Sequence, residues 1–246
     1  MKASIRAIAS GVLNVSTYAS NKSTINRLFS ATTEKKKEDI LLRLTVIDSM
    51  YSTQMTKRYY GLEELADAMY TLQMEKGRTL TELFVDFSKS PNPLLFDFSG
   101  GNLFSNHYGI GKDGKTKGIA ISLISKYAYF ATHCQFPIYD TIVCSMLPRL
   151  SLYNGFTKSK LRGENGADKM VSFVTEINSF VSRSARVGLK ISYDSLDRLL
   201  WVLGKIDRGN LSLVLSKADY LNYVSSGGTL PSRFAPFEAL LKRLPK

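Results

Sequence analysis

The amino-acid sequence predicts an all-α fold. Apolar residues recur at helical spacing over most of the chain, and no segment shows the alternation of a half-buried strand. Clusters of glycine, proline and small polar residues separate the apolar segments. The 246 residues suffice for one large helical domain or two small ones packed together. We expect a single helical unit, residues 1–246, with lobes at approximately 40–105 and 106–205 and with terminal helices.

The first clear helix is predicted over Asp39–Met50, where Ile40, Leu44 and Ile47 recur on one face. A second helix over Gly61–Met74 is expected to end near Gly77, because glycine favours helix C-termini. Further helices are predicted over Thr79–Phe87, Ile119–Thr132, Asp140 to the residue before Pro148, Lys169–Arg183, Asp194–Leu203 and Phe234–Leu244. Loops are predicted at Ser90–Gly101, His107–Gly118 and Ser151–Ala167.

The charge balance indicates a polyanionic partner. Lysine and arginine number 33 against 21 aspartates and glutamates, which gives a net charge of +12 and an isoelectric point near 9.6. Such an excess repels itself in a compact chain, so nucleic acid is the first candidate partner and an acidic membrane surface the second. A merely basic surface is the plainer interpretation. No apolar run approaches the roughly 20 residues that span a bilayer, which counts against the membrane.

Metal and cofactor chemistry find no support in the sequence. Cys134 and Cys144 are the only cysteines, and with His107 and His133 they do not form a zinc-ligand pattern. We therefore expect no metal, no cofactor and two reduced cysteines in a cytoplasmic protein. The segment Met1–Ala31 is basic, serine-rich and free of acids, which is typical either of an amphipathic first helix or of an organellar transit peptide. We favour the helix.

Lys126 is the first candidate for chemistry. It lies in the apolar segment Ile121–Phe130, where Tyr127, Tyr129 and Phe130 leave little room for water. Burial disfavours the charged form of lysine and lowers its pKa. A partly neutral amine can attack the C1′ atom of a sugar and form a Schiff base. The plainer interpretation is a lysine that extends from the core edge to solvent.

Asp140 is the second candidate. It follows Pro137 and precedes a predicted helix, which places it at the N-cap, where backbone N–H groups and the helix dipole favour the anion. A fixed anion suits the cation-like transition state of glycosidic cleavage. A helix, a turn and an N-cap are expected to bring Asp140 and Lys126 together. Taken alone, an aspartate at this position is more often a plain helix cap than a catalytic group.

At these residues the chain resembles the helix-hairpin-helix DNA glycosylases, particularly the 8-oxoguanine DNA glycosylase branch, as a divergent prokaryotic member. In that family a lysine opens the second hairpin helix, and an aspartate follows a short proline-containing loop. Lys126 matches the lysine, and Asp140 in the segment Phe136–Asp140 matches the aspartate. The resemblance covers residues 40 to 205. The family has two glycines before its lysine, whereas this chain has Ser122–Ser125, which puts the usual hairpin–phosphate contact in doubt.

The resemblance implies a two-lobed helical glycosylase fold with a helix-hairpin-helix-like element and further site residues. The family also has a polar patch that enters the space vacated by a flipped nucleotide. The segment Ser52–Arg58 resembles this patch, with Gln54 as the likeliest wedge residue to fill that space. The basic loops around Lys112–Lys117 and Lys158–Arg162 are candidates to replace the missing phosphate contact. The expected DNA-binding residues are Ser52, Thr53, Gln54, Lys57, Arg58, Lys115, Lys117 and Ser125, and the expected base-pocket residues are Tyr51, Phe136 and Tyr139.

The implied function is excision of a modified base from double-stranded DNA, leaving an abasic site, with possible strand nicking. An oxidised purine such as 8-oxoguanine, removed in base excision repair, is the first candidate substrate. A hypermodified phage base is the alternative and implies antiviral defence. Further alternatives are a non-catalytic DNA-binding protein of the same fold and an RNA-binding helical protein. We expect a monomer that is cytoplasmic and nucleoid-associated in a prokaryote, with organellar targeting left open.

Overall fold

The protein is helical, as predicted. A computed structural model describes residues 16–156 and 161–245, and most of these residues are helical. Contacts between Cα atoms divide the described chain into two compact units. Unit 1 consists of residues 16–20, 140–156 and 176–245, and unit 2 of residues 21–139 and 161–175. Residues 40–105 and 106–139, which we assigned to different lobes, belong to the same unit.

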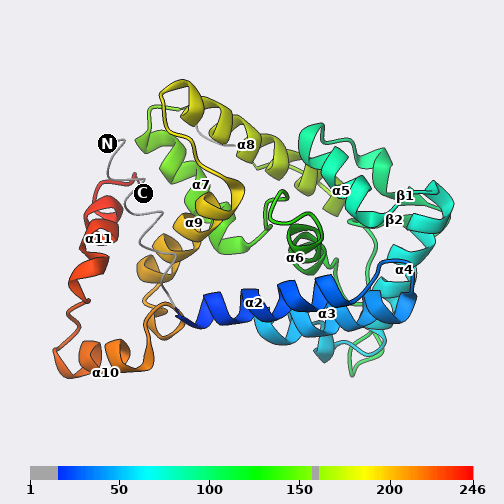
Figure 1. The fold of residues 1–246 in the computed structure, drawn as a ribbon, viewed down its shortest axis with the longest axis horizontal. Coiled ribbons are helices and arrows are strands. Elements are labelled where there is room, and N and C mark those ends of the chain that lie inside the picture. The colour runs from blue at the N-terminus through cyan, green and yellow to red at the C-terminus, as the bar shows by residue number, and fades with distance from the viewer. Residues whose placement is uncertain (1–15, 157–160, 246) are drawn as a thin grey trace. The chain divides into compact units, whose positions relative to one another are not determined.

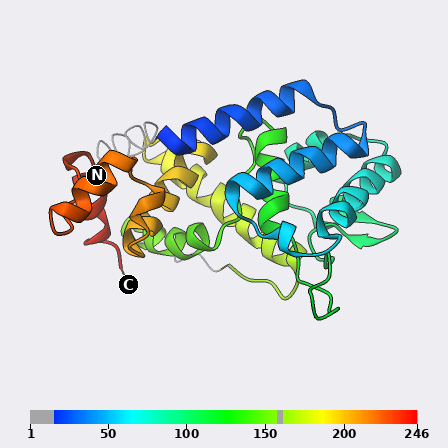
Figure 2. The ribbon, with the colours of Figure 1, turned by 90° about the horizontal axis from the view of Figure 1, so that it is seen from below.

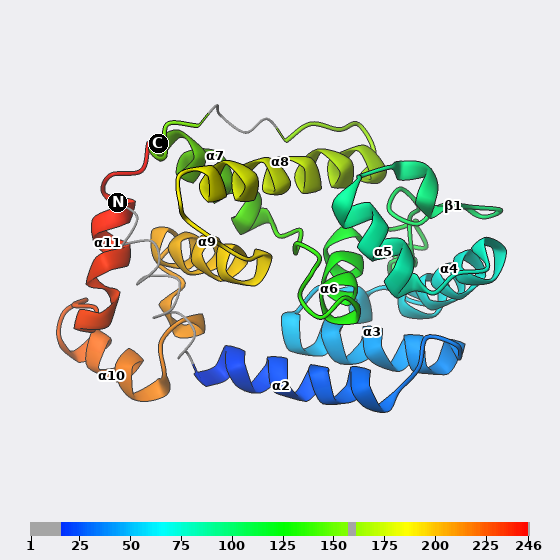
Figure 3. The same ribbon diagram turned by 45° about the horizontal axis from the view of Figure 1, so that its top comes forward.

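Unit 2 is built around helix α6, which lies in contact with α3 and α5 (Figure 1). Helices α2 and α3 lie side by side along one face of this unit (Figures 1 and 3). Its elements are α2 (Ser16–Ala31, from residue 21), α3 (Lys37–Tyr51), a 3-10 turn (Met55–Lys57), α4 (Gly61–Lys76), α5 (Leu80–Lys89), a 3-10 turn (Pro93–Phe96), β1 (Asp97–Phe98), β2 (Gly101–Asn102), α6 (Ile121–Ala131) and the first half of α8 (Gly166–Arg186).

The core of unit 2 is aromatic. Phe84 and Phe87 on α5 pack against Phe96, Phe104 and Phe136, and all five side chains are almost fully buried. The rings of Phe96 and Phe104 meet edge to face with centroids 4.8 Å apart. Burial of each such ring stabilises the fold by about 1.5–3 kcal/mol, and edge-to-face geometry adds to this. These contacts hold the middle and C-terminal half of α5 and the loop after α6 in place.

Unit 1 contains the second half of α8, α7 (Thr141–Tyr153), α9 (Tyr193–Asp207), a 3-10 turn (Leu211–Leu213), α10 (Lys217–Ser225), a 3-10 turn (Ser232–Phe234) and α11 (Ala235–Leu241). Helices α7 and α9 pack directly on each other. Gly204 permits the close approach, because a Cβ atom there would lie 2.1 Å from Cγ2 of Ile142. Helix α10, which the sequence pattern did not predict, buries none of its residues.

The predicted end of the Asp140 helix before Pro148 is wrong. Helix α7 continues through Pro148 to Tyr153. A proline inside a helix removes one backbone hydrogen bond and costs about 3 kcal/mol. Leu147 and Leu150, on either side of Pro148, are both fully buried, and each contributes about 1.5–3 kcal/mol. Their burial outweighs the cost of the proline.

The helix-end signals are confirmed at several places. Gly77 ends α4 in a left-handed conformation, with φ +60°. Thr79 caps α5 and forms a reciprocal capping box with Glu82. The loop predicted over Ser90–Gly101 contains a short turn and the first residues of a small antiparallel hairpin instead of being irregular throughout. Of the expected N-terminal helix, residues 16–31 are helical, and residues 1–15 lie outside the described part of the chain.

Candidate functional site

Lys126 lies in the middle of α6 and is nearly buried, with 4% of its surface exposed. Its side chain extends back toward the start of the helix, as helical side chains do. There the Nζ atom donates a hydrogen bond of 2.6 Å to Oγ of Ser122, one turn earlier. Apart from Ser122 and the buried Ser125, the residues around it on α6 are apolar or aromatic and buried. The structure therefore holds a primary amine in a defined orientation in a largely apolar setting.

Tyr51, one of the expected base-pocket residues, lies next to this amine. It is the last residue of α3, and its ring centroid lies 5.9 Å from Nζ of Lys126. A lysine ammonium over a tyrosine face is attracted by the electron-rich ring. The chain then turns sharply, because Ser52 and Gln54 both adopt left-handed backbone conformations, with φ of 51° and 66°. The predicted wedge Gln54 is exposed and lies three residues after Tyr51.

Asp48 holds this turn in place. Its side chain is 2% exposed, and its carboxylate accepts hydrogen bonds from the Thr53 hydroxyl and from the backbone N–H groups of Met55 and Thr56, the last two at 2.9 Å. Burial alone disfavours this carboxylate, but the hydrogen bonds outweigh it, so the pKa of Asp48 is lowered overall. One anion on α3 therefore anchors the turn at Thr53, Met55 and Thr56.

Replacing Asp48 with asparagine is expected to destabilise the protein by about 2 kcal/mol at neutral pH. The backbone N–H groups of Met55 and Thr56 lose their charged acceptor when the carboxylate becomes an amide. Since the pKa of Asp48 is lower in the folded than in the unfolded chain, its contribution is complete above about pH 4 and is lost as pH falls through the folded pKa. Urea unfolding should therefore show a larger difference in stability between the parent protein and Asp48→Asn at pH 7 than at pH 3.

The control for this experiment is Asp67→Asn, which removes an exposed carboxylate paired with Lys37. An exposed pair contributes less than about 1 kcal/mol, so this variant should unfold like the parent protein. An Asp48→Asn protein with the same stability as the parent at pH 7 would contradict the proposed anchoring role.

Asp140 is a helix N-cap, as predicted. Its carboxylate accepts a hydrogen bond of 2.7 Å from the backbone N–H of Ile142, in the first turn of α7. Asp140 is the first residue of its segment in unit 1, whereas Lys126 belongs to unit 2. Their convergence on one sugar stays a prediction. Within unit 2, the backbone N–H of Tyr139 donates a hydrogen bond of 2.9 Å to Oγ of Ser125, which ties the residue before Asp140 to the residue before Lys126.

Two of the expected site residues are buried and serve the fold instead. Ser125 is 0% exposed and uses its hydroxyl internally, to accept from Tyr139 and to donate to the carbonyl oxygen of Ser122. Its assignment as a DNA contact is therefore wrong. Phe136 is also 0% exposed and packs against Phe84 and Phe87, so it belongs to the aromatic core and not to a base pocket.

The remaining expected DNA-binding residues lie at or near the surface of unit 2. Ser52, Gln54, Lys57 and Lys115 are exposed, and Thr53 is half-buried. Lys117 forms an ion pair of 3.4 Å with Asp113 in the same loop. Arg58 is half-buried and donates to the carbonyl oxygen of Gly118 at 2.5 Å. Tyr139 is half-buried, with its ring edge-on to Phe173 at 5.2 Å.

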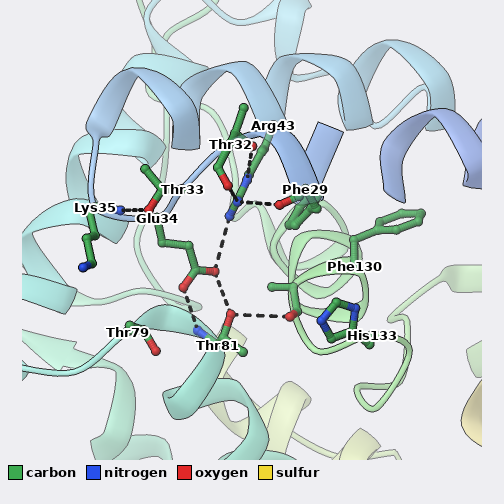
Figure 4. A pocket seen from close by; sticks show the side chains of 11 residues that line it. Phe29, Thr32, Thr33, Glu34, Lys35, Arg43, Thr79, Thr81, Phe130 and His133 are labelled. Atoms are coloured by element: carbon green, nitrogen blue, oxygen red, sulfur yellow. Dashed lines mark hydrogen bonds and ion pairs between the residues drawn. The ribbon is translucent and has the colours of Figure 1, made fainter. Parts of the chain in front are cut away.

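A separate pocket of about 280 Å³ lies between the connection of α2 to α3, the start of α5 and the end of α6 (Figure 4). Inside it, the buried carboxylate of Glu34 accepts hydrogen bonds from the backbone and hydroxyl of Thr81 and lies 3.6 Å from the Arg43 guanidinium. None of its lining residues is among the expected site residues. Each of these charged groups is engaged in holding helices together.

Sequence reasoning missed Asp48 and the exposed pair Tyr59 and Tyr60. Asp48 lies next to Ile47 on the buried face of its helix, five residues before Thr53. An acid at such a position, followed by serine and threonine, is a signal for an anion that caps a turn. Tyr59 and Tyr60 directly follow the polar patch, and two adjacent tyrosines beside lysine and arginine are a signal for nucleic-acid contact.

Comparisons with models of protein families, with curated proteins and with solved structures found no match to this chain. In residues 16–156 and 161–245, no group of three or more histidine, cysteine or acidic side chains is placed to hold a metal ion. Both cysteines are free thiols and half-buried. Within the same residues, none of the helices combines the length and the apolar composition that crossing a bilayer requires.

Proposed function

We propose that this protein is a DNA glycosylase that removes a modified base from duplex DNA, with Lys126 as its nucleophile. One observation carries the proposal. The nearly buried Lys126 amine lies 5.9 Å from the ring centroid of Tyr51, and a strained polar turn begins directly after Tyr51. The proposed reaction requires three parts. These are an amine that attacks the sugar, an aromatic ring on which the base stacks, and an exposed polar wedge that fills the vacated space.

The charge distribution supports DNA as the partner. The net charge of the chain is +12, and exposed basic residues such as Lys57, Lys112 and Lys115 lie in the turn and in the loop at 107–118. Contacts of such side chains with phosphates supply most of the affinity of a DNA-binding protein and make it salt-dependent. The glutamine wedge Gln54 offsets part of the cost of unstacking, which is a few kcal/mol.

In the proposed reaction, the neutral Lys126 amine attacks C1′ of the flipped nucleotide. The bond from C1′ to the base nitrogen breaks, its electron pair leaves with the base, and the base takes up a proton. Opening of the C1′–O4′ bond then gives an imine, which one water molecule hydrolyses to an abasic sugar and the free amine. Asp140, an anionic N-cap, is proposed to stabilise the positive charge that develops at C1′.

The substrate class follows from the family resemblance, which favours an oxidised purine such as 8-oxoguanine. A hypermodified phage base is the second candidate. Because the glycines of the usual hairpin are replaced by Ser122–Ser125, the chain is a divergent member if it belongs to this family, and such divergence suits an unusual substrate. Repair of oxidised DNA and defence against phage then differ only in the base that the site accepts.

The full chain should release a free base from one of two DNAs, an 8-oxoguanine duplex or hypermodified phage DNA, whereas unmodified DNA of the same sequence releases none. Mass spectrometry of the small-molecule fraction identifies the base. Borohydride should trap the imine as a covalent protein–DNA adduct. Absence of both base release and adduct would leave a non-catalytic binding protein. Tighter binding of structured RNA than of duplex DNA at equal salt would argue against DNA as the partner.

A further inference from the structure

The turn at Ser52–Tyr60 and the loop at 107–118 form one structure, which we call the turn–loop platform. Tyr59 and Ile110 exchange two backbone hydrogen bonds, of 2.9 and 3.0 Å, in an antiparallel bridge. The Glu64 carboxylate accepts a hydrogen bond of 2.6 Å from the backbone N–H of Gly109, and Arg58 donates to the carbonyl oxygen of Gly118. A loop that looks like an exposed surface segment in the sequence is therefore fastened to the turn that carries Gln54.

Glycine makes the close approach possible. Gly109 has a left-handed conformation, with φ +75°, which side chains rarely adopt. A Cβ atom there would lie 2.8 Å from the Cα atom of Gly61 and 2.9 Å from the carbonyl oxygen of Tyr59, both backbone atoms. The loop and the turn are thus in backbone contact. Figure 2 shows the loop in green, projecting beyond the neighbouring helices of unit 2.

The platform presents two tyrosine rings that the fold does not bury. Tyr59 is 51% exposed and Tyr60 is 66% exposed, although buried aromatic rings otherwise dominate the core of unit 2. Tyr60 also has a left-handed backbone, with φ +63°, at the position before α4. A non-glycine residue in this conformation is strained by about 1 kcal/mol or more. Neither the packing nor the backbone geometry accounts for a large ring at this position.

The charges around the rings indicate what they bind. The two segments contain five lysines and arginines against one aspartate, Asp113, and Glu63 and Glu64 follow Tyr60 in the first turn of α4. Stacking rings set among cations that meet phosphates are typical of proteins that bind unpaired nucleotides. An acidic protein partner would use the cations but would have no need of two adjacent exposed rings. The combination therefore favours a nucleic acid that contains an unstacked base, and the proposed function specifies DNA.

We propose that the turn–loop platform binds DNA at an unpaired base, with Tyr60 stacking on that base and Lys112 and Lys115 contacting the flanking phosphates. The proposal takes its ligand class from the proposed function, but it is a statement about binding alone. It assigns to Tyr60 a role in positioning DNA that is separate from the chemistry at Lys126. In a duplex from which one nucleotide has been flipped, the base left opposite is such an unpaired base.

The test compares two fluorescently labelled duplexes of the same sequence, one fully paired and one with a single unpaired 2-aminopurine. The variant Tyr60→Asn removes the ring without adding strain, because asparagine tolerates a left-handed backbone. Tyr60→Phe keeps the ring. Tyr220→Ala, which removes a 38% exposed tyrosine on α10, is the matched control. All four proteins are titrated in the same buffer and salt.

Stacking of one base on an aromatic ring corresponds to about tenfold in affinity. The parent protein, Tyr60→Phe and Tyr220→Ala should bind the unpaired-base duplex about tenfold more tightly than the paired one and quench its 2-aminopurine. Tyr60→Asn should lose this preference and keep its affinity for the paired duplex. Equal binding of both duplexes by the parent, or no change in preference on Tyr60→Asn, would overturn the proposal.

Base release is measured on the modified duplexes with the same proteins. Failure of the glycosylase proposal can then be distinguished from failure of the platform proposal. A Tyr60 effect on binding without any base release would uphold the platform and refute the glycosylase. Base release with no Tyr60 effect would refute the platform alone. Tighter binding of structured RNA than of the unpaired-base duplex, at equal salt, would also count against the platform as a DNA site.

Discussion

Replacing Lys126 with glutamine is expected to reduce base release from modified DNA by at least about a thousandfold, since loss of a covalent nucleophile is among the costliest changes in an enzyme. Glutamine has no nucleophilic amine, but its amide can still donate to the Ser122 hydroxyl, which accepts from Lys126 at 2.6 Å. Single-turnover base release, borohydride trapping and DNA affinity are the three measurements. The expected result is loss of the first two with nearly unchanged affinity.

Two further variants make this result interpretable. Lys22→Gln changes another lysine that reaches α6, through a hydrogen bond of 2.7 Å to the Tyr129 hydroxyl, and is expected to keep base release. Asp140→Asn preserves the N-cap of α7, because asparagine caps helices as well as aspartate, but removes the charge and is expected to abolish base release. Full activity of Lys126→Gln or of Asp140→Asn would refute the assigned role of that residue.

Replacing Arg43 with methionine is expected to destabilise the protein by about 3–5 kcal/mol, which is the usual consequence of leaving a buried charge without its partner. The Arg43 side chain is 5% exposed and pairs with Glu34. It also donates to the Thr32 hydroxyl, to the carbonyl oxygens of Phe29 and Thr32, and to the Tyr127 hydroxyl, which joins α2, α3 and α6. Its guanidinium lies 4.3 Å from the ring centroid of Phe29.

Urea unfolding and thermal midpoints measure the effect. Arg43→Met combined with Glu34→Gln should recover part of the lost stability, because the uncompensated carboxylate is then removed. The control Arg78→Ala breaks a pair with Asp86 whose side chains are 37% and 48% exposed, and it should cost less than about 1 kcal/mol. Equal effects of the Arg43 and Arg78 substitutions would show that the buried network contributes no more than a surface pair.

Local signals were sufficient for most of the helices. Apolar spacing predicts α3, α4 and α9, and the ends at Gly77 and Asp140 follow from capping chemistry that involves only neighbouring residues. Helix α10 was missed, and it buries none of its residues. Pro148 was misjudged because the burial that offsets its cost depends on a partner helix, α9, distant in the sequence.

The candidate site was only partly predictable, for a related reason. The proximity of Tyr51 to Lys126 joins the end of α3 to the middle of α6, and no local pattern contains that contact. Ser125 and Phe136 have residue types that suit a DNA site, but each is fully buried by neighbours that a linear pattern does not reveal. The bridge between Tyr59 and Ile110 likewise depends on two separate loops.

The division of the chain into two units has a consequence for the order in which helix contacts can form during synthesis. Unit 2 is nearly continuous in sequence, whereas the Asp140 segment of unit 1 packs through α7 against α9, with Gly204 over Ile142. During synthesis, α9 is made only after α8, so α7 has no partner helix until then. Helix α6, which carries Lys126, contacts α3 and α5, and both precede it in the chain. The contact of α7 with α9 at Gly204 can therefore form only after synthesis has passed residue 204, later than the contacts of α6 with α3 and α5 become available.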